Sequence, residues 1–345
     1  MNELTDKLAR ERILERGEFK ALLDCGSDNA YLHRRARMAR EEVFGNKIYI
    51  RGLIEFTSYC KRNCYYCGLR KGNADAKRYR LTKEQILECC AEGHELGFRT
   101  FVLQGGEDGY FTDDILADIV RTIKSEYPDC AITLSLGERG YESLKLLRRA
   151  GADRYLLRQE TSNDNHYSML HPPEMELSTR KKCLWDLKEI GYQVGCGFMV
   201  GSPGQTTDHI VDDLLFIKEL DPAMVGIGPF IPHSSTPFAD KAQGDLHLTL
   251  NALAILRLMK PSLLLPATTA LGTILDTGRE MGVMAGANVV MPNLSPADAR
   301  EKYLLYNNKI CTDESARLCR GCIARRMQSV GCEVVTSRGD YVDAL

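Results

Sequence analysis

Three cysteines near residue 60 offer the most specific chemistry in this sequence. Cys60, Cys64 and Cys67 have the spacing C-x3-C-x2-C, and Tyr66 directly precedes the third cysteine. Thiolates are soft ligands that select zinc or iron–sulfur clusters. A structural zinc site takes four protein ligands, and the next histidine along the chain is His94. Three thiolates can instead hold a four-iron cluster whose last iron stays open to another ligand. The alternative is a zinc knuckle or three unliganded thiols.

The composition limits the compartment and the class of partner. The chain has 13 cysteines among 345 residues and starts with a charged, helical segment instead of a secretory signal, which argues against a disulfide framework. Its 45 Lys and Arg nearly balance 47 Asp and Glu, so it is not a globally basic nucleic-acid binder. No apolar run approaches the ~20 residues of a membrane helix. We expect a cytoplasmic protein that binds neither nucleic acid nor membrane.

The elements that must position the cysteines alternate regularly between strand and helix. Each strand pattern is short and apolar, and an amphipathic helix pattern follows each one, the first at 81–97 and the last at 296–306. The predicted strands are 47–56, 99–105, 131–137, 154–160, 192–201, 224–230, 263–268 and 288–293.

Eight such units predict an α/β fold, a complete (β/α)8 TIM barrel, and a doubly wound open sheet is the rival. The barrel would span 47–306, between an N-terminal helical extension (1–46) and a short cysteine-rich C-terminal tail (307–345).

The cysteine segment FTSYCKRNCYYCGLR resembles the signature of the radical S-adenosylmethionine (SAM) superfamily, C-x3-C-x-aromatic-C after the first barrel strand. The resemblance implies a [4Fe-4S] cluster on Cys60, Cys64 and Cys67, with SAM chelating the fourth iron. It also implies that one electron from the cluster cleaves SAM to methionine and a 5′-deoxyadenosyl radical. Tyr66 matches a position that contacts adenine in this superfamily.

Other segments fit that cofactor. QGGED (104–108) follows the second strand and resembles a Gly-Gly-Glu motif that holds the methionine ammonium. Gly105 and Gly106 would let the ligand approach the backbone, and Glu107 would match its positive charge. The remaining cofactor candidates come from later strands and one helix: Glu160 for the ribose hydroxyls, Arg180 for the methionine carboxylate, and Met199 for adenine.

A narrower resemblance, to the HydE maturases of [FeFe]-hydrogenase, covers about residues 47–322. The segments that carry it include LQGGED, GADRYLLRQET, MVGSPGQT, MVGIGPFIPH, PATTALGT and GANVVMPN. It implies that the radical attacks the cysteine sulfur of a small iron carbonyl–cyanide complex, with an electron donor and other hydrogenase maturases as partners. The alternatives are a radical SAM mutase or synthase of the biotin synthase and methylornithine synthase group, acting on a small amino-acid-like substrate, and an electron-transfer or metal-carrier protein.

The tail holds a second set of thiols. Cys311, Cys319 and Cys322 have the spacing C-x7-C-x2-C, and some HydE proteins carry an accessory iron–sulfur cluster there. A zinc site or unliganded thiols is the alternative, and Cys332 is a candidate fourth ligand that nothing in the sequence fixes. The other cysteines are expected to be packed or incidental thiols.

Polar residues on the predicted strands suggest a hydrated cavity inside the barrel, because barrel interiors are normally filled with branched apolar side chains. An anionic substrate would then meet the arginines among them. The resemblance implies that matching positions line the cavity and that two tyrosines close its bottom near the tail. These candidates are Arg51, Gln104, Thr133, Ser135, Arg154, Arg158, Thr268, Thr269, Tyr303 and Tyr306.

Overall fold

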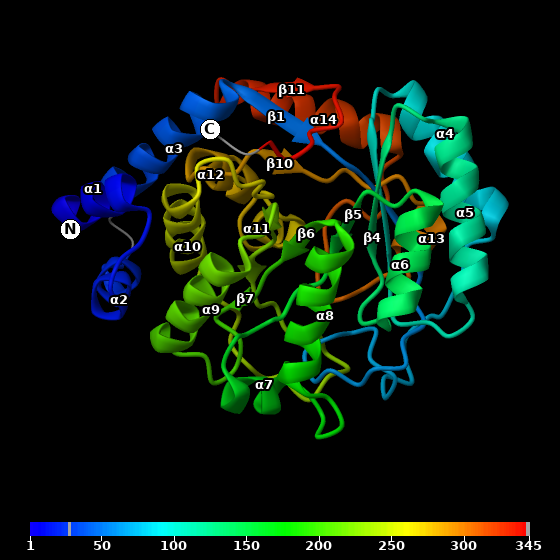
Figure 1. Cartoon of the computed structure of the whole chain (residues 1–345), viewed down its shortest axis with the longest axis horizontal. Helices are drawn as coiled ribbons and strands as arrows, with labels where there is room; N and C mark the ends of the chain where they lie inside the picture. Colours follow the sequence, from blue (N-terminus) through cyan, green and yellow to red (C-terminus); the bar gives the residue numbers. More distant parts are fainter. Residues whose placement is uncertain (27–28, 343–345) are drawn as a thin grey trace.

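A parallel sheet forms the centre of the molecule in the computed structural model, which describes residues 1–26 and 29–342. Its strands pair in the order β2-β3-β4-β5-β6-β8, so neighbours in sequence are neighbours in space (Figure 1). Helices connect them as parallel crossovers require. The strands are β2 (Gly52–Thr57), β3 (Thr100–Gly105), β4 (Ala131–Ser135), β5 (Arg154–Leu156), β6 (Gln193–Cys196) and β8 (Met224–Val225).

Isolated parallel bridges continue the pairing beyond β8. Met224 pairs with Leu264, Pro266 pairs with Val289 of β10 (Val289–Val290), and Asn293 pairs with Leu53 of β2. The segment predicted as the seventh strand, 263–268, therefore contributes bridges to both neighbours. Beyond the ends of β6 and β8, the short strands β7 (Met199–Val200) and β9 (Gly228–Pro229) pair with each other.

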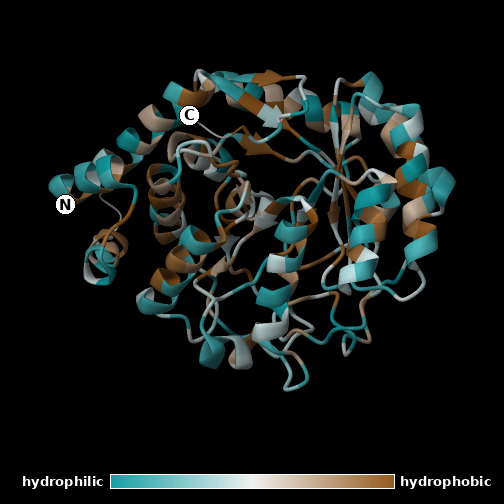
Figure 2. Ribbon diagram, viewed as in Figure 1, coloured by the Kyte–Doolittle hydropathy of each residue, from teal (hydrophilic) through white to brown (hydrophobic). Residues whose placement is uncertain are grey.

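The helices lie outside the sheet with their apolar sides turned inward (Figure 2). Thr82 and Thr112 accept hydrogen bonds from backbone N–H groups in the first turns of α4 and α5, as N-caps do. α10 is the most apolar, because α3 (Ala30–Phe44) of the N-terminal extension covers its outer side. The helices that follow the strands are α4 (Lys83–Glu95), α5 (Asp113–Glu126), α6 (Tyr141–Ala150), α7 (Asp164–Leu170), α8 (Leu177–Ile190), α9 (Thr207–Leu220), α10 (Leu246–Met259), α11 (Thr269–Ile274) and α12 (Gly278–Met284). Within the described chain, no helix combines the length and apolar character that crossing a membrane requires.

Several element predictions were wrong in extent. The segments 192–201 and 224–230 each form two short strands, and 263–268 makes only isolated bridges. The first strand breaks at Arg51, because β1 (Lys47–Ile50) pairs with β10 and β11 (Glu333–Val335), whereas β2 pairs with β3. The helix predicted at 296–306 is only α13 (Ala297–Arg300). The chain leaves the helical path there because the Leu305 carbonyl accepts from Gly68 N–H at 2.9 Å, which ties this segment to the cysteine loop.

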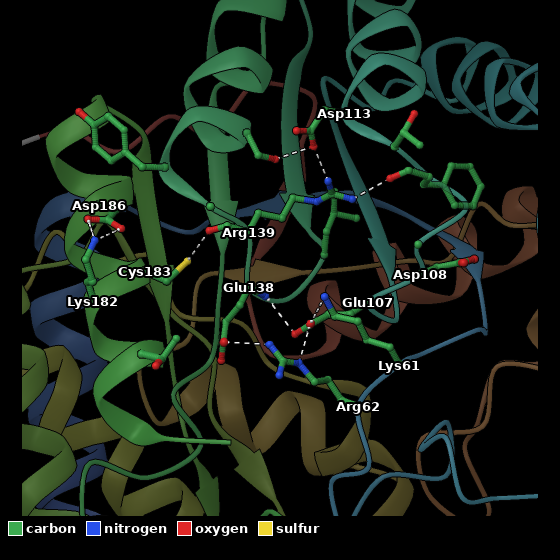
Figure 3. Close-up of a pocket in the computed structure, with 18 residues that line it drawn as sticks. Lys61, Arg62, Glu107, Asp108, Asp113, Glu138, Arg139, Lys182, Cys183 and Asp186 are labelled. Carbon is green, nitrogen blue, oxygen red and sulfur yellow. Dashed lines mark hydrogen bonds and ion pairs between the residues drawn. The ribbon is translucent and has the colours of Figure 1, made fainter. Parts of the chain in front are cut away.

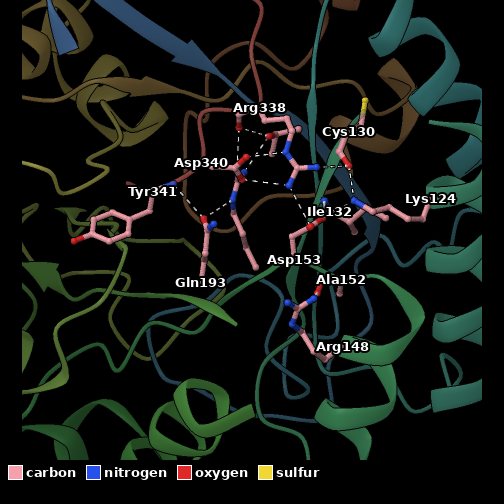
Figure 4. Close-up of polar contacts among 12 residues, drawn as sticks. Lys124, Cys130, Ile132, Arg148, Ala152, Asp153, Gln193, Arg338, Asp340 and Tyr341 are labelled. Atoms are coloured by element: carbon pink, nitrogen blue, oxygen red, sulfur yellow. Dashed lines mark hydrogen bonds and ion pairs between the residues drawn. The ribbon is translucent and has the colours of Figure 1, made fainter. Parts of the chain in front are cut away.

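The tail is structured and crosses the amino end of the sheet. It forms α14 (Ala316–Ser329) and β11, which extends β1 in parallel. The last described residues lie against strand starts (Figure 4): Arg338 binds Asp153, and Asp340 accepts from Arg154 at 2.6 Å. Arg154 and Arg338 hold the pKa of Asp340 down at about 2, so the network is charged at neutral pH. The tail thus closes the end of the sheet opposite the cysteine loop.

Candidate functional site

A cavity of about 400 Å³ lies at the carboxyl ends of the strands. It extends from Cys64 and Cys67 on the loop after β2 to Cys311 and Cys319 of the tail. Most predicted site residues border it. Besides these four cysteines they are Tyr66, Gln104, Gly105, Ser135, Arg158, Glu160, Arg180, Met199, Thr268, Thr269, Tyr303 and Tyr306.

The cysteine loop is held by its own chain and by one arginine that the sequence analysis missed. The Arg78 guanidinium donates to the carbonyls of Ser58, Leu69 and Arg70 at 2.5, 2.9 and 2.8 Å. The Cys60 thiol accepts from the Glu107 backbone N–H at 3.4 Å. The Arg78 side chain therefore holds both ends of the loop that carries the three cysteines. Its only sequence signal is its position at the end of the loop.

The thiols of this loop sit in surroundings that disfavour a free thiolate. Burial raises the pKa of Cys64 to about 12 and raises the pKa of Cys67 as well. A neighbouring positive charge of the size of a metal centre would deprotonate them, because coordinated thiols lose their protons outright. The donor set thus fits a metal cluster better than it fits an exposed nucleophile.

Glu107 differs from its predicted role. Its carboxylate lines a separate pocket outside the cavity (Figure 3), where Arg62 donates to it at 2.6 Å and the Glu138 backbone N–H at 3.0 Å. Arg62 also binds Glu138 at 3.0 Å, and Glu138 in turn binds Arg180 at 2.6 Å. The nearer positive partner of Glu107 in this structure is Arg62, and Lys61 lies 3.6 Å away. We call the row Glu107–Arg62–Glu138–Arg180 the ion-pair wall.

Glu160 and Arg180 both border the cavity. Glu160 has a φ of +70°, a strained conformation for a residue with a side chain, and its carboxylate accepts from Arg158 at 2.9 Å. A backbone bridge to Phe198 holds it there. Arg180 is 8 % exposed and donates to the Arg158 carbonyl at 3.3 Å. Strain at a cavity edge is typical of functional residues.

Tyr66 is oriented by a histidine that the sequence did not single out. Its hydroxyl lies 3.2 Å from His171 Nε2, and His171 Nδ1 lies 3.0 Å from the Tyr167 carbonyl. Burial lowers the pKa of His171 to about 3, so the ring is neutral at pH 7. Since Nδ1 must carry the proton to donate to a carbonyl, Nε2 accepts from the Tyr66 hydroxyl.

Three predicted cavity residues lie elsewhere. Arg51, Thr133 and Arg154 border a separate void of about 10 Å³ at the amino ends of the strands. Arg154 is neutralised by Asp340 of the tail, and Arg51 Nη1 points at the Met224 sulfur at 2.7 Å. The prediction that Arg154 balances a cavity anion therefore conflicts with this ion pair.

The two tyrosines are also displaced from their predicted place at the bottom. Tyr303 and Tyr306 lie at the carboxyl end, where the Gln104 amide donates to the Tyr303 hydroxyl at 3.4 Å. Three charged residues of the cavity were not predicted: Glu55, Arg279 and Lys309. Lys309 donates to Glu55 at 2.6 Å, and these side chains are 8 % and 1 % exposed.

The structure brings two of the three tail cysteines together. Cys311, Cys319 and Glu314 place a sulfur or carboxylate oxygen within 4.8 Å of one another. Cys322 is one turn further along α14 and is not in that group. Cys332 is buried and accepts from Arg40 at 3.2 Å, away from the group. A buried cation, Arg279, lies 3.8 Å from the Cys311 sulfur.

Comparison with known proteins decides the family. Residues 54–217 match the model of the Radical SAM superfamily. The [FeFe] hydrogenase maturase subunit HydE of Thermotoga maritima is 45% identical over 331 residues, covering 95% of this chain and 94% of that protein. The chain belongs to the HydE family. It is a radical SAM enzyme, and its family uses a [4Fe-4S] cluster and SAM.

More distant relatives share the fold of this HydE chain. The 3-methylornithine synthase of Methanosarcina acetivorans is 29% identical, covering 96% of this chain and 94% of that protein. The crystal structure of methylornithine synthase (PylB) matches with a TM-score of 0.84 and 28% identity, over 96% of this chain and 97% of that one. The structure of HydG, a maturase of the [FeFe]-hydrogenase, matches with a TM-score of 0.80 at 20% identity, over 97% and 75% of the two chains, which shows the fold alone.

Gly106 gives a direct test of how tightly the HydE cysteine loop is seated. A Cβ atom at Gly106 would lie 2.2 Å from the Tyr59 carbonyl oxygen and 2.6 Å from the Cys60 Cβ, so Gly106→Ala must push the loop away. We expect an overpacking cost of about 1–3 kcal/mol and reduced iron retention after reconstitution. Gly109→Ala is the matched control, since nothing lies within 4 Å of its Cβ position. Equal iron content in both variants would contradict the inference that close packing at Gly106 holds the cysteine loop in place.

Proposed function

We propose that this chain is a HydE-type maturase that acts in assembly of the [FeFe]-hydrogenase H-cluster. The observation that carries the proposal is the convergence of Cys64, Cys67, Glu160 and Arg180 on one cavity in a chain 45% identical to a HydE maturase. The methylornithine synthase relatives are only 28–29% identical to this chain. They are therefore weaker models for its function than the HydE maturase.

The residues fit the cluster and SAM. Cys60, Cys64 and Cys67 would hold three irons of a [4Fe-4S] cluster, and SAM would take the fourth. When bound, this pair supplies a 5′-deoxyadenosyl radical by one-electron cleavage of SAM. Arg180 has a guanidinium edge at the cavity and would meet the methionine carboxylate. The ion-pair wall keeps Arg180 in place from outside, so Glu107 acts at a distance from the ligand.

The other cofactor contacts follow from side chains that are already oriented. The strained Glu160 presents its carboxylate to the cavity, where it would accept hydrogen bonds from ribose hydroxyls. Tyr66 is fixed by neutral His171 and would contact adenine, with Met199 on the opposite strand end. The glycines of the GGED turn would face SAM through Gly105, which borders the cavity.

The substrate side of the cavity suits a small anion. Arg158, Thr268, Thr269 and Tyr306 border it, and so does Arg279, which makes no ion pair within the described chain. We propose that an iron carbonyl–cyanide complex with a cysteine ligand binds there and that its cysteine sulfur is the radical's target. Arg279 donates to the Thr269 hydroxyl at 3.1 Å and lies 3.8 Å from the Cys311 sulfur. It would take a negative group, because a buried guanidinium without a carboxylate partner is otherwise costly.

The proposal extends to the architecture and the tail. The bridges from β8 through Leu264 and Val289 to β2 support a complete (β/α)8 barrel at 47–306, between the helical extension and the tail. The tail cysteines Cys311, Cys319 and Cys322 would hold an accessory cluster. Other hydrogenase maturases would supply the substrate and receive the product. The cytoplasmic location stays a prediction.

A hydrogenase maturation assay tests this function. A mixture of the remaining maturases and an apo [FeFe]-hydrogenase should produce hydrogen only when the reconstituted protein is added. We expect activity above background to depend on SAM and on a reductant. Maturation that proceeds equally without the protein would contradict the proposal. Formation of 5′-deoxyadenosine together with methylornithine would instead favour the synthase alternative.

A further inference from the structure

A fully buried carboxylate on α9 takes no part in the site described above. Asp213 is 0 % exposed, and burial raises its pKa to about 7. Its Oδ1 accepts from the side-chain amide of Gln159 at 3.1 Å. The polar side chains beside it, those of Gln159 and Ser162, carry no charge that would balance a carboxylate. Burying an acid in this way is costly, so stability alone does not explain why α9 carries one here.

The amide of Gln159 lies in a break between two strands of the sheet. The ladder between β5 and β6 ends at Leu156, and pairing resumes as a bridge between Glu160 and Phe198. Within the break, Gln159 Oε1 accepts from the Gly197 backbone N–H at 2.9 Å. A side-chain amide therefore takes the place of a backbone acceptor between the two strand ends.

Asp213 determines which way this amide points. Because Gln159 Oε1 accepts from Gly197, Nε2 must donate, and the Asp213 carboxyl oxygen is its acceptor. Without that acceptor, Nε2 would be a buried donor with no partner, and the amide would gain by turning away. We call Asp213, Gln159 and Gly197 the α9 clamp.

Glu160 is the residue that the α9 clamp holds. Its φ of +70° is a conformation that residues with a side chain rarely adopt, so contacts around it must maintain it. Glu160 N–H donates to the Gly197 carbonyl at 3.1 Å, and the Glu160 carbonyl accepts from Met199 N–H at 3.3 Å. The clamp fixes Gly197 through its N–H, and Gly197 fixes Glu160 through its carbonyl.

We propose that Asp213 is a positioning residue for SAM, which acts through Gln159 to hold Glu160 in the conformation that presents its carboxylate to the ribose hydroxyls. This role rests on the proposed function, which assigns Glu160 to the ribose. Among the described residues, the lining of the cavity includes neither Asp213 nor Gln159, so both act without touching the ligand. The clamp should therefore affect the binding of SAM and not its cleavage.

Calorimetry of SAM binding to the reconstituted protein tests this role. Asp213→Ala removes the acceptor, and we expect the Kd for SAM to rise about tenfold, which is the value of one hydrogen bond to a charged group. Asp213→Asn keeps an acceptor oxygen and should restore binding. The control is Leu220→Ala, which removes a buried side chain about two turns further along the same helix. It should lower the melting temperature and leave the Kd unchanged.

Two further readouts separate positioning from a general loss of structure. At saturating SAM, Asp213→Ala should form 5′-deoxyadenosine with dithionite at the wild-type rate, because only binding is weakened. In a Glu160→Ala background the ribose contact is already lost, so adding Asp213→Ala should weaken SAM binding no further. Gln159→Leu removes the same hydrogen bond from the other side and replaces Asp213→Ala if that protein does not fold.

Four results would overturn the role of Asp213. These are an unchanged Kd in Asp213→Ala, an equal loss in Leu220→Ala, a loss in Asp213→Asn as large as in Asp213→Ala, or a further loss when Asp213→Ala is added to Glu160→Ala. Unchanged SAM binding in Glu160→Ala alone would contradict the ribose contact and, with it, the role of Asp213. Maturation that proceeds without the protein contradicts the proposed function, whereas the SAM affinities still decide what Asp213 does.

Discussion

Replacing Cys64 by alanine is expected to reduce SAM cleavage by about a hundredfold or more. Cys64 is one of three proposed cluster ligands, and the two remaining thiols cannot hold a four-iron cluster by themselves. Replacing even a residue that only hydrogen-bonds to a metal ligand lowers metal affinity or activity about 10–100-fold. The variant should retain less iron after anaerobic reconstitution and form almost no 5′-deoxyadenosine with dithionite. Liquid chromatography of the products and iron analysis give the two readouts.

The control for Cys64→Ala is another cysteine that should not be a ligand. Cys25 lies in the N-terminal extension, where its thiol donates to the Leu22 carbonyl at 3.1 Å. Cys25→Ala should keep wild-type iron content and cleavage, because it removes only a partly buried thiol. Undiminished cleavage by Cys64→Ala would remove this cysteine from the cluster site.

The predicted residues that can be located from the sequence are those whose spacing is local. The C-x3-C-x2-C motif and the alternation of strand and helix are readable along the chain, and both place Cys64 and Glu160 at the carboxyl ends of strands. The role of Glu107 stays a prediction, and the partner that its carboxylate has in this structure, Arg62, lies 45 residues away along the chain. The sequence pattern shows that a carboxylate is present, but it does not show which cationic side chain forms an ion pair with it in the folded protein.

The errors at the two ends of the sheet share a physical cause. Arg154 and Tyr303 were predicted to lie at particular places in the cavity from strand position or from resemblance. Contacts with residues far away in the sequence determine where their side chains lie. Asp340 neutralises Arg154 at the amino end, whereas the tie between Leu305 and Gly68 brings Tyr303 to the carboxyl end. Tertiary contacts of this kind override local helix propensity, which is why the eighth helix is short.

The buried ion pair between Lys309 and Glu55 gives the second large expected effect. Lys309 donates to Glu55 at 2.6 Å and to the Tyr303 carbonyl at 2.9 Å, while Asn293 donates to the other Glu55 oxygen at 2.7 Å. Lys309→Met leaves the Glu55 charge buried with only an amide partner. Breaking a buried pair from one side costs about 3–5 kcal/mol, and we expect about 3 kcal/mol because this pair borders a cavity. Urea unfolding followed by circular dichroism measures the loss.

A double variant distinguishes loss of charge balance from loss of packing. Glu55→Gln/Lys309→Met removes both charges and keeps the shape of Glu55, so it should regain most of the stability that Lys309→Met loses. Lys302→Met breaks an exposed pair with Asp298 and should cost less than about 1 kcal/mol. A double variant as unstable as Lys309→Met would mean that the lysine acts through packing alone. Recovery would assign the loss in Lys309→Met to the unpaired Glu55 charge, in a pair that joins β2 to the tail segment two residues before Cys311.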